Sequence, residues 1–184
     1  MKKAFTLVEI SIVVIISAIL FVLLSKVYIL ASKLYVYQTN VKNIETDLFF
    51  FNQTLQNLAD SSQVNFSKYI NLKNTYGITG SLYLKQWNTS YKIFATWWQI
   101  LMYKNVDWKL LKIPLTNTWA TFVKTLKFKI IPYVDPFKIY LPTNTQPLVK
   151  VYLDIQNRFY NKWNWAQDVK FTLQESFNFR YYDF

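Results

Sequence analysis

The sequence predicts an α+β protein. A long N-terminal helix, transmembrane in its first half and amphipathic in its second, packs on an antiparallel β-sheet head. Three observations predict this class. No proline or glycine occurs before Gly77. Apolar residues in that stretch recur at steps of three and four, the spacing of one helix face. After Ser62, apolar and polar residues alternate, as they do in half-buried strands.

The first apolar segment runs from Phe5 to Leu24, and Glu9 is its only charged residue. A helix of that length spans about 30 Å, the thickness of the hydrocarbon core of a bilayer. Lys2 and Lys3 precede the segment, and such positive charge stays on the cytoplasmic side. We therefore expect a single-pass protein of the cytoplasmic (inner) membrane, with its N-terminus in the cytoplasm and its head outside.

An amphipathic segment continues the helix over residues 25–60. One narrow apolar stripe follows it without a slip: Val27, Leu30, Leu34, Tyr37, Val41, Ile44, Leu48, Phe51, Leu55 and Leu58. We expect one helix from about Phe5 to Ala59, ended by Asp60-Ser61-Ser62. A coiled coil is one cover for such a stripe, and the head that follows at once is the other.

Residues 61–184 are expected to form the head, an antiparallel sheet with one buried face. Within Thr121–Ile131, the side chains of Leu126, Phe128 and Ile130 fall on one face and three polar residues on the other. Further alternating runs predict strands at Val149–Gln156, Val169–Gln174, Ser81–Lys85, Ser90–Thr96, Gln99–Lys104 and Lys109–Leu115.

The composition excludes several kinds of chemistry. The chain has 184 residues with no cysteine and no histidine, so disulfides, thiolate metal sites and histidine-based catalysis are excluded. The ten acidic residues are scattered, without paired carboxylates in a recognisable motif. We therefore expect a protein that is not an enzyme and that holds no metal and no cofactor.

The formal net charge is +11, and aromatic residues make up 20% of the chain. Such a surface suits nucleic acid, acidic glycans or anionic lipid. The simpler interpretation is a solvated sheet face, because the lysines alternate with apolar residues, so nucleic acid is not the favoured partner. The candidate anion-binding surface consists of Lys124, Lys127, Lys129, Lys138 and Lys150.

Glycine is scarce and tryptophan abundant. There are two glycines and seven tryptophans, whereas average glycine usage of about 7% predicts roughly thirteen. The tryptophans all lie where turns are expected: Trp87, Trp97, Trp98, Trp108, Trp119, Trp163 and Trp165. Bulky residues suit the left-handed backbone of tight turns poorly.

Our hypothesis is that several or all of these tryptophans are glycine in the living protein. Some bacterial lineages read the codon UGA as glycine, and a common alternative code reads it as tryptophan. One rival interpretation is a set of exposed tryptophans that stack on sugars or bases. Another is ordinary tryptophan packing.

The N-terminus resembles the signal of type IV prepilins. The family pattern is a short basic leader, a small residue and then Phe-Thr-Leu-x-Glu before a long apolar run. Lys2-Lys3-Ala4 and Phe5-Thr6-Leu7-Val8-Glu9 match it, except that Ala4 stands where glycine is usual. The resemblance covers about Lys2–Leu24, and a long helix followed by a small β-rich head is the pilin layout. In their pattern of aromatic and acidic residues, residues 28–62 are most similar to J-type minor pseudopilins of type II secretion and W-type minor pilins.

The resemblance implies a processing pathway. A prepilin peptidase would cut between Ala4 and Phe5, so that residues 1–4 are a leader, and the new amine of Phe5 would be N-methylated. The mature chain would enter a filament outside the cytoplasm with other pilins or pseudopilins as partners.

Glu9 is the residue whose presence most needs a reason. A carboxylate at bilayer depth costs about 2.5–3.5 kcal/mol on insertion scales, so it persists when paired or functional. The resemblance implies that Glu9 pairs with the charged Phe5 amine of a neighbouring subunit, which favours a defined axial register. The alternative is a Glu9 that snorkels to the cytoplasmic interface and has no role in assembly.

These observations predict a structural minor pilin or pseudopilin of a type IV pilus or type II secretion filament. Two alternatives stay open. One is a DNA-uptake (competence) pilin that gathers phosphate on the lysine surface. The other is a single-pass membrane-anchored binding protein unrelated to filaments, which would not be cut after Ala4.

Overall fold

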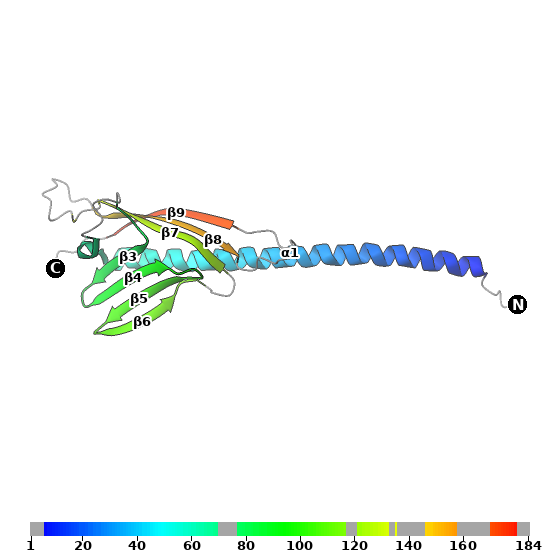
Figure 1. Ribbon diagram of the computed structural model, residues 1–184, viewed down its shortest axis with the longest axis horizontal. Helices are drawn as coiled ribbons and strands as arrows, with labels where there is room; N and C mark the ends of the chain where they lie inside the picture. The colour runs from blue at the N-terminus through cyan, green and yellow to red at the C-terminus, as the bar shows by residue number, and fades with distance from the viewer. Residues whose placement is uncertain are drawn as a thin grey trace.

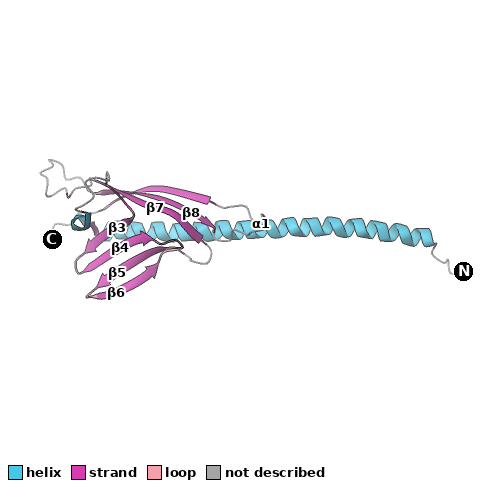
Figure 2. Cartoon of the chain, in the orientation of Figure 1, coloured by secondary structure: helices cyan, strands magenta, loops and turns pink. Residues whose placement is uncertain are grey.

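The computed structural model describes residues 6–69, 77–116, 121–132, 135, 146–157 and 170–179. One long helix carries two antiparallel sheets beside its C-terminal part, and its N-terminal part extends away from them (Figure 1). Figure 2 shows the strands gathered around one end of the helix. The predicted α+β class, with a long apolar helix and a β-sheet head, is confirmed.

Helix α1 runs from Leu7 to Ser61 without a break. Its sequence explains this continuity, because it contains neither proline nor glycine. Ser62 ends the helix: its backbone is extended, and its N–H donates to the Leu58 carbonyl over 2.8 Å. The Ser62 hydroxyl donates to the same carbonyl. The predicted stop at residues 60–62 is therefore confirmed.

The described strands form two sheets. A 3₁₀ helix, η1 (Phe66–Tyr69), lies between the first two strands. One sheet has the order β1-β3-β4-β5-β6, formed by Gln63–Val64, Ser81–Gln86, Thr89–Ala95, Ile100–Val106 and Lys109–Pro114. The other has the order β2-β7-β8-β9, formed by Ile78–Thr79, Thr121–Ile131, Leu148–Asn157 and Lys170–Asn178.

All seven predicted strands are present, and most of their ends agree within two residues. The division into two sheets differs from the single sheet that alternation predicted. The reason is that alternation reports which side chains are buried and not which strands pair. The two-residue strand β2 pairs with β7, and after Gly80 the chain enters β3, which pairs with β1 and β4.

One hydrophobic core joins both sheets to the helix. Ile44, Phe51 and Leu55 of α1 are fully buried. The alternating residues of β7 and β8 lie in the same core, as predicted: Leu126, Phe128, Ile130, Val149, Val151, Leu153 and Ile155. Val123, which the alternation did not predict, is buried with them. Strand β7 has a β-bulge at Lys124, where the register with β8 shifts between Val123 and Thr125. Because of this extra residue, Val123 and Leu126 are both buried although they are three residues apart.

The head covers only the later part of the helical stripe. Ile44, Phe51, Leu55 and Leu58 are buried, and Val41 and Leu48 pack partly against the core. The earlier members, Val27, Leu30, Leu34 and Tyr37, remain exposed. Of the two covers for the stripe, the head is thus the one observed, and it begins near residue 40.

Three tryptophan-containing turns connect the strands of the first sheet, as predicted. Trp87-Asn88 joins β3 to β4, Trp97-Trp98 lies between β4 and β5, and Asp107-Trp108 joins β5 to β6. The φ angles are positive at Trp87 (43°), Asp107 (45°) and Trp108 (68°). A side chain in this left-handed region costs on the order of 1–3 kcal/mol. Trp119, Trp163 and Trp165 lie outside the described residues.

Candidate functional site

The candidate site is the start of α1, where Thr6 and Glu9 bond to each other. Thr6 is the N-cap of the helix, and its hydroxyl oxygen accepts from the Glu9 N–H over 3.3 Å. In return, Glu9 Oε2 accepts from the Thr6 N–H at 2.9 Å and from the Thr6 hydroxyl at 3.0 Å. This is a capping box, in which side chains at the N-cap and three residues later satisfy each other's backbone donors.

The capping box gives Glu9 a partner within its own chain. The first N–H groups of a helix have no intrahelical acceptor, and such unsatisfied groups are costly in a bilayer because no water replaces the missing bond. A carboxylate at this end is also favoured by the helix dipole. Glu9 therefore has a local structural reason to be there, in addition to any intermolecular one.

Thr6 is the residue of the candidate site that the sequence does not single out as a prediction. The charge of Glu9 marks it as a candidate, whereas Thr6 belongs only to the prepilin-like pattern. The signal was readable, since Thr-x-x-Glu before an apolar run is the sequence signature of a capping box. Lys2, Lys3, Ala4 and Phe5, the predicted leader and processing residues, lie outside the described residues.

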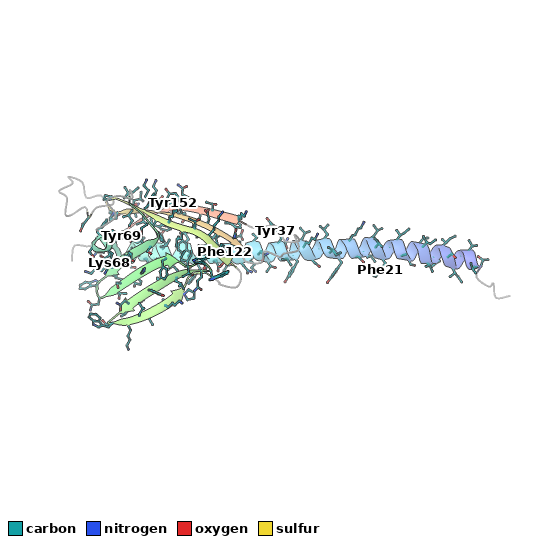
Figure 3. The ribbon with its side chains drawn as sticks, viewed as in Figure 1. Phe21, Tyr37, Lys68, Tyr69, Phe122 and Tyr152 are labelled. Atoms are coloured by element: carbon teal, nitrogen blue, oxygen red, sulfur yellow. The ribbon has the colours of Figure 1, made fainter. Side chains whose placement is uncertain are left out.

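The helix that follows presents an uncovered apolar surface. It is long and apolar enough to cross a membrane, and none of its most apolar stretch is buried against the head. Figure 3 shows Phe21 on this bare part of the helix. The hydroxyls of Ser11 and Ser25 donate to the carbonyls of Leu7 and Phe21 at 2.9 and 2.8 Å. Because these bonds satisfy the hydroxyl donors within the helix, the two serines can lie in an apolar environment.

Exposed aromatic residues continue beyond the membrane-length segment. Tyr28, Tyr35 and Phe49 are 75%, 71% and 70% exposed. Phe21, Tyr28 and Tyr35 follow each other at steps of seven residues, and Phe49 comes fourteen residues after Tyr35, with Lys42 halfway between them. Phe49 is two residues from the buried Phe51, which places it on the opposite side of the helix. The exposed surface of α1 therefore carries large aromatic side chains beyond the membrane-length segment, with the charged Lys42 between them.

The predicted lysine surface lies mainly on the outer face of the second sheet. Lys127 pairs with Tyr152, and Lys129 pairs with Lys150 across β7 and β8. These residues alternate with buried ones and so share the solvent face; Tyr152 is labelled in Figure 3. Lys124 is exposed at the bulge, and Lys138 lies outside the described residues. Two lysines directly opposite each other are mildly destabilising, and an anion between them would relieve this repulsion.

A second basic surface was not predicted. In the first sheet, Tyr83, Lys92, Tyr103 and Lys112 form one cross-strand row on the face opposite the core. The Lys92 ammonium lies 5.4 Å from the ring centre of Tyr83 and 5.0 Å from that of Phe94. Strand register brings this row together, and register cannot be read from the alternation of any single strand. The rings already pack against this cation, which indicates a structural role.

The buried hydroxyl of Tyr69 also has a structural role. The Tyr69 hydroxyl donates to the Ser81 carbonyl over 3.3 Å and accepts from the Tyr83 N–H. Burial raises the pKa of Tyr69 well above its usual value, so the group stays protonated at neutral pH. It ties η1 to the edge of β3; Figure 3 labels Tyr69 at the head.

Comparisons with protein-family models, with curated proteins and with solved structures gave no match. Among the described residues, no group of three or more potential metal-ligating side chains comes together. The architecture itself, one long apolar N-terminal helix packed on antiparallel sheets, is compatible with a pilin-like protein and with a single membrane-spanning segment.

Proposed function

We propose that this chain is a structural, non-enzymatic subunit of an extracytoplasmic filament: a minor pilin or pseudopilin of a type IV pilus or type II secretion system. The observation that carries the proposal is Glu9. It is the only acidic residue in the apolar segment, and it is held at the helix start by Thr6, four residues after Phe5. Glutamine would serve the capping box equally well, so the cap alone does not explain a residue whose charge is costly at that depth.

In this proposal, a prepilin peptidase cuts after Ala4 and exposes the charged amine of Phe5, which is then N-methylated. Glu9 accepts both bonds from Thr6 on the single oxygen Oε2. A carboxylate has further acceptor sites, so Oε1 can take the Phe5 amine of a neighbouring subunit while the cap is kept. That pairing neutralises two charges in an apolar filament core.

The exposed face of α1 supports the same proposal. Tyr28, Tyr35 and Phe49 lie beyond the membrane-length segment and are at least 70% exposed. Tyr28 and Tyr35 belong to a contiguous exposed apolar surface that runs to Tyr37, and such a surface marks an interaction site. A filament in which neighbouring subunits surround the helix would cover this face.

Glu9 variants test the proposal and separate its two interactions. Glu9→Gln keeps a capping side chain, because glutamine also serves at this position, but it removes the charge. Glu9→Ala removes both the cap and the charge. We expect both variants to insert into the membrane and to be cut after Ala4, and both to be lost from filaments at least tenfold. Normal incorporation of Glu9→Gln would show that charge pairing plays no part.

Processing is the second test. Co-expression with a prepilin peptidase should shorten the chain by residues 1–4, and mass spectrometry should find an N-methylated Phe5. Ala4→Gly, which restores the residue usual in the family, should be cut at least as fast. An uncut Ala4–Phe5 bond in both proteins would favour the membrane-anchored binding protein that is unrelated to filaments.

A DNA-uptake pilin is the second candidate function, and the outer face of β7 and β8 favours it. Lys127, Lys129 and Lys150 meet there. Binding of duplex DNA by the full chain in detergent should fall steeply between low and moderate salt, because each phosphate contact releases counterions. Replacement of these three lysines by glutamine should abolish the salt dependence. No DNA binding at low salt would exclude this candidate.

A further inference from the structure

The turns of the first sheet contain tryptophan at backbone positions that are built for glycine. Val106 pairs with Lys109, so Asp107 and Trp108 are the two central residues of a hairpin turn, and both have positive φ angles, of 45° and 68°. Positive φ at both central positions defines the type I′ turn, for which Asn-Gly and Asp-Gly are the preferred pairs. Trp108 occupies the glycine position of that pair.

The turn between β3 and β4 repeats the pattern with another turn type. Gln86 pairs with Thr89, which leaves Trp87 and Asn88 as the central residues. Trp87 has a φ of 43°, and Asn88 is not among the described residues with positive φ. A two-residue hairpin with positive φ at its first central position takes glycine there, as in the type II′ turn. Trp87 therefore also occupies a glycine position.

The two tryptophan side chains lie mostly outside the fold that would have to offset this backbone conformation. Trp108 is 98% exposed and Trp87 is 73% exposed. A tryptophan stabilises a fold through the large area that it buries, and these two bury little. Bulky residues with positive φ are outliers that persist where the surrounding structure requires them. Here the hairpins require the backbone shape, and most of each indole ring is exposed.

The glycines of the chain point the same way. Among the described residues, four have positive φ, and only one of them, Gly77 at 73°, is a glycine. The chain has two glycines and seven tryptophans, all of the latter in expected turns. A shortage of glycine and an excess of tryptophan in the same places have one explanation if the two residues have been exchanged.

We propose that positions 87 and 108 are glycine in the chain that the cell makes. In the gene, UGA codons would stand at these positions. A tRNA of the host would decode them as glycine, whereas translation of the gene under a different code gives tryptophan. Any of the other five tryptophans encoded by UGA would change with them. Decoding acts on every UGA codon alike, so a tryptophan without positive φ, such as Trp97, would also be glycine where its codon is UGA.

The proposal bears on binding by the head. Exposed tryptophans at the tips of two neighbouring hairpins would otherwise be read as stacking sites for sugars or bases. With glycine at positions 87 and 108, the tips present backbone in tight turns, and no ligand site is formed by indole rings. This inference is independent of the proposed filament function and stands or falls without it.

Peptide sequencing of the protein from its native host tests the identity of these residues. Trypsin cuts after lysine, so Trp87 falls in the peptide Gln86–Lys92 and Trp108 in Asn105–Lys109. We expect tandem mass spectra to show glycine at both positions and the gene to show UGA codons. Tryptophan in either peptide, or UGG codons at these positions, would overturn the proposal.

A second measurement tests the physical argument with the full chain made recombinantly in detergent. Trp108→Gly and Trp87→Gly should each raise the denaturant midpoint of the head, because glycine adopts positive φ without steric cost. Trp97→Gly is the matched control: it is also an exposed turn residue, but its φ is not positive. It should not raise the midpoint, because glycine adds only unfolded-state entropy there. Destabilisation by Trp108→Gly would contradict the backbone argument.

Discussion

The Thr121 hydroxyl donates a hydrogen bond of 2.8 Å to the Asp47 carboxylate, which joins the first residue of β7 to the C-terminal half of α1. Thr121 is fully buried, and Asp47 is half-buried. The two residues are 74 positions apart. This bond fixes where along the helix the second sheet sits, and apolar contacts alone do not specify such a position closely.

The first prediction concerns this bond. Thr121→Val keeps the shape of the side chain and removes the hydroxyl, so it should destabilise the head by about 1–3 kcal/mol. The measurement is the shift in urea midpoint of the full chain in detergent. Thr172→Val is a matched control, because the Thr172 hydroxyl donates to Asp154 over the same 2.8 Å but at an exposed site. The control should change stability by less than about 0.5 kcal/mol; equal losses would refute a special role for the buried bond.

The second prediction compares two phenylalanines on opposite sides of the helix. Phe51 is fully buried in the core, whereas Phe49 is 70% exposed. Phe51→Ala should cost about 3–5 kcal/mol, because it leaves a cavity. Phe49→Ala should change the stability of the isolated subunit by less than about 0.5 kcal/mol, yet it should reduce incorporation into filaments. A large loss of subunit stability in Phe49→Ala would place that residue inside the core.

The third prediction concerns Asn40, where the head begins to cover the helix. Asn40 is buried, and its Nδ2 has no hydrogen-bond partner in the structure. An unsatisfied buried amide costs about 1–3 kcal/mol, so Asn40→Leu, which is similar in size, should stabilise the head by about that amount. Gln38 lies two residues earlier on the helix and is exposed, so Gln38→Leu is the comparison and should leave stability nearly unchanged. A destabilised Asn40→Leu would mean that the amide has a polar partner in solution.

The fourth prediction is the response of the head to alkaline pH. Burial raises the pKa of Tyr69, whereas tyrosine in an unfolded chain ionises near pH 10. The unfolded state therefore loses its proton first, and stability should fall above about pH 10 by about 1.4 kcal/mol per pH unit until the folded group ionises too. Burial also raises the pKa of Tyr91, which adds a loss of the same sign.

Tyr69→Phe isolates this effect. The variant should be less stable by about 1–3 kcal/mol at pH 7, because the Tyr83 N–H loses its acceptor. It should then lose stability less steeply than the wild type between pH 10 and 11, where the Tyr91 contribution is common to both proteins. Urea midpoints at pH 7, 9, 10 and 11 measure the difference. Parallel curves for the two proteins would show that Tyr69 is not the group responsible.

Much of the fold was readable because it depends on local patterns. An uninterrupted run without proline or glycine sets the length of α1, and a polar break ends it at Ser61. The strands follow from alternation, and Thr121–Ile131 is predicted to the residue. Glu9 is conspicuous in the sequence because it is the only charged residue in an otherwise apolar segment. Thr6, its capping partner, is equally local, because Thr-x-x-Glu is itself the sequence signature of a capping box.

Tertiary structure alone decided what depends on residues far apart in the sequence. Alternation marks the buried side of each strand, but only pairing assigns β2 to β7 and β3 to β1 and β4, so two sheets replace one. The stripe on α1 has the same spacing before and after Asn40, and only the extent of the head decides which part is covered. Likewise, the turn positions came from the sequence, but the positive φ at Trp87 and Trp108 came from strand register. Local sequence determined the elements of this protein, because hydrogen bonding and side-chain periodicity act within a few residues. Their arrangement was decided by contacts that form only when the chain has folded.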